Sequence, residues 1–218
     1  MGCNVSIVQY RRLSINGATG NLSLGADSPV ELALQLAREQ DANRMKILLL
    51  GAGESGKSTV LKQIKMIWKV GGGPDNEELQ KYVNAIRTNA LDAIKVLLDA
   101  GKNLGIPITD AANPLIAEYA CTVAKIADAC NVTPTLGHEI ATLWGHESVQ
   151  RIFSKRDEFW NMDNTPYYLE EVERLMDSDY EPTEEDMIMT RVRTTGIVVT
   201  HCPDPPLSYE VVDVGGYV

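Results

Sequence analysis

A glycine-rich segment carries the clearest chemical signal of the chain. Residues 51–58 read GAGESGKS and fit the pattern G-x-x-x-x-G-K-[ST]. Glycines let consecutive backbone N–H groups approach a phosphate closely, at a helix N-terminus that favours anions. Lys57 would bring a positive charge to the β- and γ-phosphates, and the Ser58 hydroxyl could ligate Mg²⁺. The pattern predicts a phosphate-binding loop; the alternative is a glycine-rich strand–helix turn without a ligand.

Two later segments could complete such a site. Residues 213–216 read DVGG after a strand candidate, so a carboxylate could hold Mg²⁺ through water and a glycine amide could contact the γ-phosphate. Residues 190–196 read TRVRTTG and offer two arginines for phosphate charge and several hydroxyls for Mg²⁺. Alone, the first is usually a turn and the second is typical of a solvated strand edge. Both gain weight because a phosphate loop precedes them.

The N-terminus carries a lipidation pattern. Residues 1–6 read MGCNVS, which fits N-myristoylation of Gly2 after removal of Met1. Cys3 beside it is a candidate for palmitoylation. One myristoyl chain gives only marginal membrane binding, so a second acyl chain makes attachment stable. We expect a lipid anchor on Gly2 and Cys3; the alternative is an unmodified cytosolic N-terminus.

The phosphate loop needs a strand before it and a helix after it. Residues 45–50 read MKILLL, and this short apolar run followed by glycines predicts a buried strand. Beyond Lys57, apolar side chains recur at helical spacing, at Val60, Leu61, Ile64, Ile67 and Trp68. The loop therefore has the strand–loop–helix context that its chemistry requires.

The segment upstream of that strand divides into two parts. Residues 1–27 are rich in Gly, Ser and Asn after the lipidation pattern, and we expect them to be poorly ordered. Ser28-Pro29-Val30-Glu31 is typical of a helix start, with Ser as N-cap and Pro in the first turn. It predicts an N-terminal helix over residues 28–44.

A helical block interrupts the nucleotide-binding part. Residues 71–74 read GGGP, the clearest linker of the chain, and apolar spacing stays helical from 76 to about 186. Strand character returns at 196–202 and 207–214. We therefore expect a nucleotide-binding domain from residues 45–73 and 187–218, with an inserted helical domain at 74–186.

Composition excludes several other classes of protein. The 218 residues carry 20 basic and 30 acidic side chains, for a formal net charge of −10. This balance argues against nucleic-acid binding, which needs clustered Lys and Arg. The 4 cysteines show neither a C-x-x-C pair nor metal-ligand spacing with histidines, so we expect reduced thiols.

Taken together, the motifs resemble those of the α subunits of heterotrimeric G proteins. The resemblance rests on the strings GAGESGKST, LKQIK, RVRTTGIV and VVDVGG, and on the helical block between them. It implies an α/β fold: a phosphate-loop, Ras-like GTPase domain with an inserted all-helical domain. It also implies that GTP or GDP binds between the two domains with Mg²⁺.

The resemblance assigns roles to individual residues. The phosphate-contacting loop would comprise Glu54, Ser55, Gly56, Lys57, Ser58 and Thr59. The first switch would include Ile188, Met189, Thr190 and Arg191, and the second would begin with Asp213, Val214, Gly215 and Gly216. Ser58 and Thr194 would ligate Mg²⁺. Arg191 would be the built-in arginine finger, which stabilises charge on the transferring phosphoryl group.

Partners follow from the same resemblance. It implies a βγ dimer, a G protein-coupled receptor and a downstream effector, at the cytoplasmic face of the plasma membrane. The function implied is a GTP-hydrolysing switch that couples membrane receptors to effectors. Another phosphate-loop enzyme, such as a kinase or ATPase, is disfavoured by the helical block and by the RVRTTG segment.

The sequence also departs from the family pattern. Tyr217 follows DVGG where the family has a glutamine that orients the attacking water, and the guanine-reading motif N-K-x-D is not in the sequence. We expect the chain to correspond to roughly the first three-fifths of such a subunit, with about three of six sheet strands. The alternative function is therefore a membrane-tethered, truncated binding module without GTP turnover.

Overall fold

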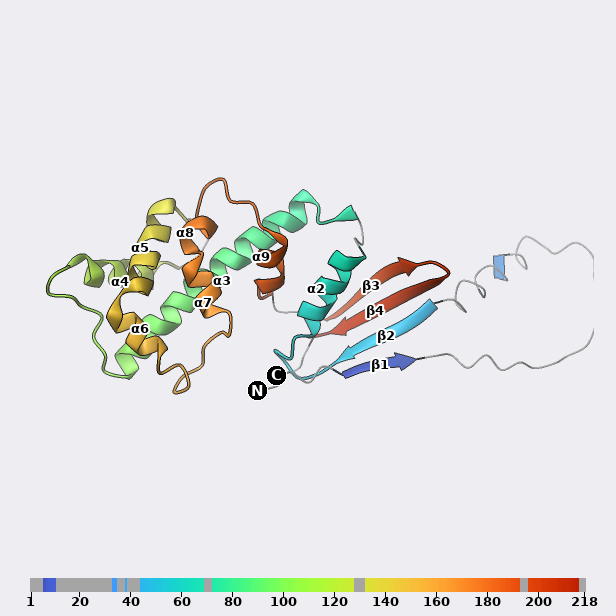
Figure 1. Cartoon of the computed structure of the whole chain (residues 1–218), viewed down its shortest axis with the longest axis horizontal. Coiled ribbons are helices and arrows are strands. Elements are labelled where there is room, and N and C mark those ends of the chain that lie inside the picture. The colour runs from blue at the N-terminus through green and yellow to red at the C-terminus, as the bar shows by residue number, and fades with distance from the viewer. Residues whose placement is uncertain are drawn as a thin grey trace, which may run out of the picture. The chain divides into compact units, whose positions relative to one another are not determined.

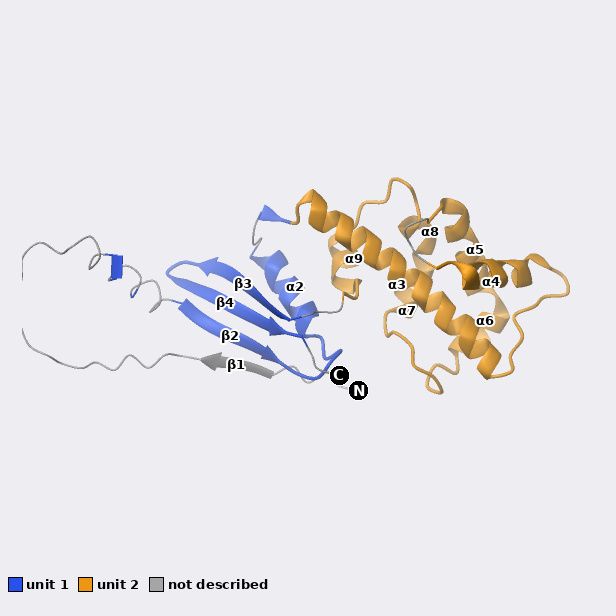
Figure 2. Ribbon diagram, turned by 180° about the vertical axis from the view of Figure 1, so that it is seen from behind, with its two compact units in different colours: residues 1–73, 193–218 blue, residues 74–192 orange. Residues whose placement is uncertain are grey.

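The computed structural model describes residues 6–10, 33–34, 38, 44–68, 72–127, 132–192 and 196–215. The chain forms two compact units, coloured separately in Figure 2. One comprises Met1–Gly73 with Arg193–Val218 and is called the sheet unit below; the other comprises Pro74–Val192 and is called the helical unit.

The sheet unit is built on a 4-stranded sheet with the order β1-β2-β4-β3. The strands are β1 (Ser6–Tyr10), β2 (Arg44–Leu50), β3 (Ile197–Asp204) and β4 (Leu207–Val214). β2 and β4 run parallel, whereas β1 pairs with β2 and β3 pairs with β4 in antiparallel fashion (Figure 1). The strands expected at 45–50, 196–202 and 207–214 thus lie in one sheet, with β2 and β4 ending at the same edge.

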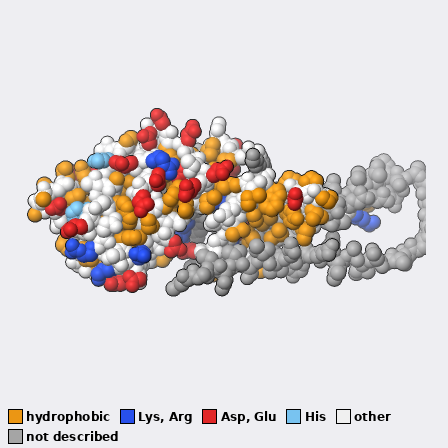
Figure 3. All heavy atoms as spheres, in the orientation of Figure 1, with side chains coloured by type: hydrophobic (Ala, Val, Ile, Leu, Met, Phe, Trp, Pro, Cys, Tyr) orange, Lys and Arg blue, Asp and Glu red, His pale blue; other side chains and the backbone are white. Residues whose placement is uncertain are grey.

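Helix α2 (Lys57–Ile67) packs against this sheet and buries a small core. The cluster contains Leu49 of β2, Leu61 of α2, Cys202 of β3 and Val211 of β4. Along β3 the pattern alternates: Thr200 and Cys202 are buried, whereas side chains of opposite parity remain in contact with solvent. Figure 3 shows hydrophobic side chains gathered over the sheet unit. Large exposed ones are Leu50, Ile67, Trp68, Ile197, Val199 and Leu207.

The N-terminal part corrects two expectations. Ser6–Tyr10 forms strand β1, although residues 1–27 were expected to be poorly ordered and only three strands were expected. This segment contains β-branched and aromatic residues, and the edge of β2 offers unpaired backbone groups. Within the predicted helix at 28–44, the described residues Ala33, Leu34 and Arg38 are helical, but Arg44 already belongs to β2. The rest of that helix and the lipidation sites Gly2 and Cys3 lie outside the described residues.

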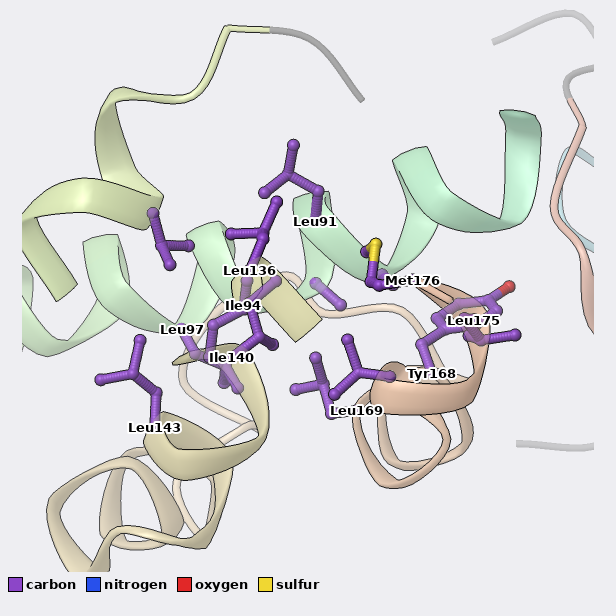
Figure 4. Packing of buried hydrophobic residues seen from close by; sticks show 14 of the residues in the cluster. Leu91, Ile94, Leu97, Leu136, Ile140, Leu143, Tyr168, Leu169, Leu175 and Met176 are labelled. Atoms are coloured by element: carbon purple, nitrogen blue, oxygen red, sulfur yellow. The ribbon is translucent and has the colours of Figure 1, made fainter. Parts of the chain in front are cut away.

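The helical unit is built around one long helix, α3 (Asn76–Asn103). Asp75 caps this helix: its side chain accepts a hydrogen bond from the Glu78 N–H. The shorter helices are α4 (Leu115–Lys125), α5 (Pro134–Gly145), α6 (Glu147–Phe153), α7 (Thr165–Glu170), α8 (Val172–Leu175) and α9 (Glu184–Met189). The apolar faces of α3 through α8 meet in a single buried cluster. Figure 4 shows Ile94 and Leu97 of α3 facing Ile140 of α5, with Tyr168 and Leu169 of α7 beside them.

The second boundary of the helical unit lies later than expected. Contacts place residues through Val192 in this unit, whereas we expected the nucleotide-binding domain to resume at 187. The reason is that α9 and the residues after it are hydrogen-bonded to α3 and α7, as described below. Among the described residues, no helix combines the length and apolarity needed to span a membrane.

Candidate functional site

The phosphate loop joins the end of β2 to the start of α2. Leu50 is the last residue of the strand and Lys57 is the first of the helix. Gly56, at the N-cap, has φ 84° and ψ 7°, a left-handed conformation that residues with a Cβ rarely adopt. Glu54 also has a positive φ, of 63°. The loop therefore turns sharply into the helix N-terminus, where free N–H groups favour an anion.

The buried side chain of Lys57 holds this loop through hydrogen bonds to its backbone. Its side chain is only 6% exposed, and its Nζ donates hydrogen bonds to the Gly51 carbonyl at 2.9 Å and the Ala52 carbonyl at 2.7 Å. The Ser55 hydroxyl oxygen lies 3.5 Å from the same nitrogen. The ammonium group is thus held beneath the loop that would receive the phosphates. It contributes positive charge where a polyphosphate would lie.

A serine and a carboxylate meet beside the loop. Parallel pairing of β2 with β4 sets Asp213 opposite Leu49, at the carboxyl ends of both strands. The Ser58 hydroxyl, one residue into α2, donates a 2.6 Å hydrogen bond to Asp213 Oδ2. Two residues that are 155 positions apart in sequence are therefore brought into direct contact.

The other oxygen of this carboxylate is a candidate ligand for a cation. Asp213 is 1% exposed, and its Oδ1 is buried without a hydrogen-bond partner among the described residues. Such an oxygen is costly to bury unless a ligand satisfies it. Mg²⁺ prefers hard oxygen ligands and usually retains several waters. The Ser58 hydroxyl and the Asp213 carboxylate therefore fit Mg²⁺, directly or through water.

The other described residues that were predicted for the site lie in the loop, in the first turn of α2 and at the end of β4. Glu54 is exposed, whereas Ser55 in the loop and Thr59 in the first turn of α2 are half-buried. Val214 pairs with Ile197 of β3, and the Gly215 N–H donates a 2.8 Å hydrogen bond to the Gly196 carbonyl. Gly216 and Thr194, the last of the predicted second-switch residues and the second predicted Mg²⁺ ligand, lie outside the described residues.

The predicted first-switch segment belongs to the helical unit. Ile188 and Met189 end helix α9, and the Met189 carbonyl accepts hydrogen bonds from Asn164 Nδ2 at 2.9 Å and from the Tyr168 hydroxyl at 2.6 Å. Thr190 is 3% exposed, and its hydroxyl donates to the carbonyl of Asp186 at 2.6 Å. The backbone of this segment is therefore fixed from the α7 side.

Arg191 is anchored at both its backbone and its side chain. Its N–H donates a 2.8 Å hydrogen bond to Asn89 Oδ1 on α3. Its Cζ lies 5.4 Å from the ring centroid of Trp160, an indole that is 58% exposed. The charged end of the predicted arginine finger therefore contacts an aromatic side chain of its own unit.

Asp186 ties the start of α9 to the rest of the unit. Its carboxylate is completely buried and accepts two 2.9 Å hydrogen bonds from Arg174. The Tyr167 hydroxyl adds a third at 2.7 Å. Burial alone would raise the pKa of Asp186, but the bonds from Arg174 and Tyr167, with others from Thr183, outweigh burial and hold this pKa well below its usual range.

Several residues of this arrangement could not be identified from the sequence. Asn89, Trp160, Asn164 and Tyr168 approach residues 189–191 only in three dimensions, and none of them belongs to a recognisable motif. The exception is the T-x-x-D spacing of Thr183 and Asp186, which is a capping-box signal and forms a capping box at α9.

Comparison with known proteins identifies the family. A model of the G-protein alpha subunit matches residues 26–217. Guanine nucleotide-binding protein alpha-8 subunit of Dictyostelium discoideum is 47% identical over 174 residues, which are 78% of this chain and 42% of that protein. The alpha-1 subunit of Mycosarcoma maydis is 36% identical over 216 residues, 99% of this chain and 58% of that protein.

A third relative agrees with these. The guanine nucleotide-binding protein subunit alpha of Emericella nidulans is 37% identical over 188 residues, 85% of this chain and 53% of that protein. The chain belongs to the G-protein alpha subunit family, which confirms the resemblance found in its motifs. It spans about half the length of the curated relatives it matches.

Proposed function

We propose that this chain forms the phosphate- and Mg²⁺-binding part of a GTP-hydrolysing signalling switch. The observation that carries the proposal is the contact between Ser58 and Asp213 beside the loop braced by Lys57. Family membership supplies the nucleotide: the relatives are named as guanine nucleotide-binding proteins. GTP and GDP are therefore the ligands we assign to the loop.

Each residue of the loop has a separate task. Backbone N–H groups of residues 54–59 would donate to the phosphate oxygens, as at other helix N-termini that bind anions. Lys57 would place its ammonium between the β- and γ-phosphates. Ser58 and Thr194 would hold Mg²⁺ directly, and Asp213 would hold it through water. The cation would neutralise charge on the phosphates.

Hydrolysis would depend on Arg191. A guanidinium that reaches the transferring phosphoryl group stabilises its charge, and such an arginine is worth about 10³–10⁵ in rate. The side chain is exposed on the helical unit. We therefore assign Arg191 as the catalytic arginine, with residues 188–190 as the segment that carries it.

Membrane attachment is part of the proposal. Myristoylation of Gly2 and palmitoylation of Cys3 would hold the protein at the cytoplasmic face of the plasma membrane, because two acyl chains anchor far more firmly than one. There the protein would meet a βγ dimer, a G protein-coupled receptor and an effector. A Gly2→Ala variant should move from the membrane fraction to the soluble fraction, and unchanged fractionation would refute the anchor.

A second function is favoured by one residue. Tyr217 occupies the position after DVGG, and a phenol cannot supply the paired donor and acceptor with which a carboxamide orients water. A membrane-tethered module that binds partners without turning over GTP is the alternative. Single-turnover hydrolysis of radiolabelled GTP separates the two functions, since only the switch exceeds an Arg191→Ala control.

The binding step is tested with Lys57→Ala. Loss of this cation should weaken binding of Mg²⁺–GTP about 10- to 100-fold, because hydrogen bonds to charged groups contribute about 1.5–3 kcal/mol. Lys65→Ala, in the last turn of the same helix, is the matched control and should bind normally. Equal affinities of the Lys57→Ala variant and the unmodified chain would contradict the site.

A further inference from the structure

We propose that Trp160 is the positioning residue for the guanidinium group of Arg191. The inference rests on the proposed role of Arg191, and it adds a residue that no motif identifies. Trp160 lies in the irregular segment between α6 and α7, and its ring centroid is 5.4 Å from Arg191 Cζ. This distance is within the range in which an aromatic face attracts a cation.

The backbone on the arginine side of the contact is fixed. The Met189 carbonyl is bonded by Asn164 and Tyr168, and the Arg191 N–H is bonded by Asn89. These three bonds come from α3 and α7 and from the residue before α7. They determine where the Arg191 Cα lies, but they leave its long side chain several rotatable bonds. An exposed arginine loses about 2 kcal/mol of side-chain freedom when it is ordered.

The backbone on the tryptophan side is also held. The Thr165 hydroxyl donates a 2.9 Å hydrogen bond to the side chain of Asn161, the residue after Trp160, and the Thr165 N–H donates to the Met162 carbonyl. Thr165 is completely buried. The indole therefore projects from a fixed segment and offers a defined surface, although it is 58% exposed.

The chemistry of this partner suits a catalytic arginine. A carboxylate would neutralise the guanidinium and occupy its N–H groups, which the phosphoryl oxygens need. An aromatic face attracts the cation through its quadrupole and uses none of those donors. Trp160 can thus restrict the side chain of Arg191 without itself occupying the N–H groups that phosphate oxygens would need.

The helical unit contains a matched pair for comparison. Arg156 Cζ lies 4.8 Å from the ring centroid of Phe153, the last residue of α6. Like the Trp160 contact, it joins an arginine to an aromatic ring in the same unit. An effect that is specific to the positioning of Arg191 should appear when Trp160 is substituted and should not appear when Arg156 is substituted.

The contact itself is tested by ¹⁹F NMR of nucleotide-free protein labelled with fluorotryptophan. The chain has 3 tryptophans, and the Trp160 signal is assigned by its loss in Trp160→Phe. Arg191→Ala should shift that signal and leave the Trp68 signal in place, whereas Arg156→Ala should leave the Trp160 signal unchanged. If the Trp160 signal does not shift in Arg191→Ala, the proposal is wrong, whether or not the protein hydrolyses GTP.

The consequence is tested by single-turnover GTP hydrolysis. Trp160→Ala should lower the rate constant about two- to fivefold, the factor that an exposed cation–π contact is worth, with GTP affinity unchanged. Trp160→Phe should restore most of the rate, and Trp160→Ala should add nothing in an Arg191→Ala background. Because the indole is exposed, its removal leaves no buried cavity that would unfold the unit.

The outcomes separate this proposal from the proposed function. If Trp160→Ala matches the unmodified chain in rate, or slows hydrolysis equally without Arg191, the positioning role is wrong while GTP turnover stands. If no variant or parent hydrolyses GTP, the switch function fails, and the ¹⁹F experiment alone decides whether Trp160 holds Arg191.

Discussion

The two units of this chain stabilise themselves in different ways. The helical unit buries one continuous cluster contributed by α3 through α8, in which Ile86, Ile94 and Leu97 are completely inaccessible. The sheet unit buries a cluster of Leu49, Leu61, Cys202 and Val211, and leaves Ile197 and Val199 68% and 47% exposed. Yet the phosphate loop and the buried Asp213 lie in the sheet unit. Chemistry here depends on loop geometry and strand ends, whereas independent stability depends on core size.

The largest expected difference between the units is tested by producing the helical unit alone. A chain limited to residues 74–192 should keep its helical circular dichroism and unfold cooperatively, because its core is closed within that range. Loss of helical signal, or a melt without a cooperative transition, would show that the helical unit depends on the sheet unit.

Truncating a side chain should lower the free energy of unfolding by several kcal/mol more in the helical core than at an exposed strand position. Ile94→Ala removes a completely buried side chain from the helical core and should lower the free energy of unfolding by about 2–5 kcal/mol. Val199→Ala, on an exposed position of β3, should change it by less than about 0.5 kcal/mol. Denaturant unfolding followed by circular dichroism gives both values, and equal losses would remove the contrast.

The ion pair between Asp186 and Arg174 tests how much a buried charge contributes to the stability of the helical unit. Removing one partner of a buried pair costs about 3–5 kcal/mol, but Arg174 is 40% exposed, so Asp186→Ala should cost nearer 2–3 kcal/mol. Glu147→Ala, which removes one partner of an exposed pair with Arg151, is the control and should cost less than about 1 kcal/mol.

The same pair predicts a pH dependence. The pKa of Asp186 is lowered in the folded unit, so its contribution to stability is complete above its unfolded pKa of about 3.9. Stability should then fall as the pH is lowered from this value toward the folded pKa. Unfolding curves of the unmodified chain and Asp186→Ala should converge in this acidic range; a constant difference between them would contradict the ion-pair account.

A smaller effect than these is expected at the phosphate loop. At Gly56 a new Cβ would meet no atom within 4 Å, so Gly56→Ala tests backbone conformation alone. Its φ of 84° should cost alanine about 1–2 kcal/mol, which weakens Mg²⁺–GTP binding about 5- to 30-fold. Gly145 is the last residue of α5, and a Cβ added there would also meet no atom within 4 Å. Gly145→Ala is therefore the control and should not affect binding.

The sequence predicted what local patterns encode. The loop at 51–58, the strand before it and the helix after it depend on neighbouring residues, and the structure contains all three. The sequence also predicted Asp213 at the end of a strand, whereas its contact with Ser58 depends on the parallel pairing of β2 with β4 and was not predicted. Strand β1 was missed because it is only 5 residues long and its pairing depends on the edge of β2.

The surroundings of Arg191 were less accessible to prediction. Asn89 lies 102 positions away from Arg191, and its bond depends on how α3 packs against the residues after α9. Trp160 carries no spacing or motif that distinguishes it from an ordinary surface aromatic. Such residues emerge only once the helices are packed, because the contacts that define them are tertiary.

The most direct test concerns the cation site at the end of β4. Mg²⁺ should tighten GTP binding by the unmodified chain, and Asp213→Asn should reduce this Mg²⁺-dependent gain about tenfold or more, because the buried Oδ1 loses its charge. Glu210→Gln, on the same strand, removes a carboxylate that pairs with Arg44 and Lys46 and should leave the gain intact. A Mg²⁺ dependence that is unchanged in Asp213→Asn would contradict the assignment of this carboxylate.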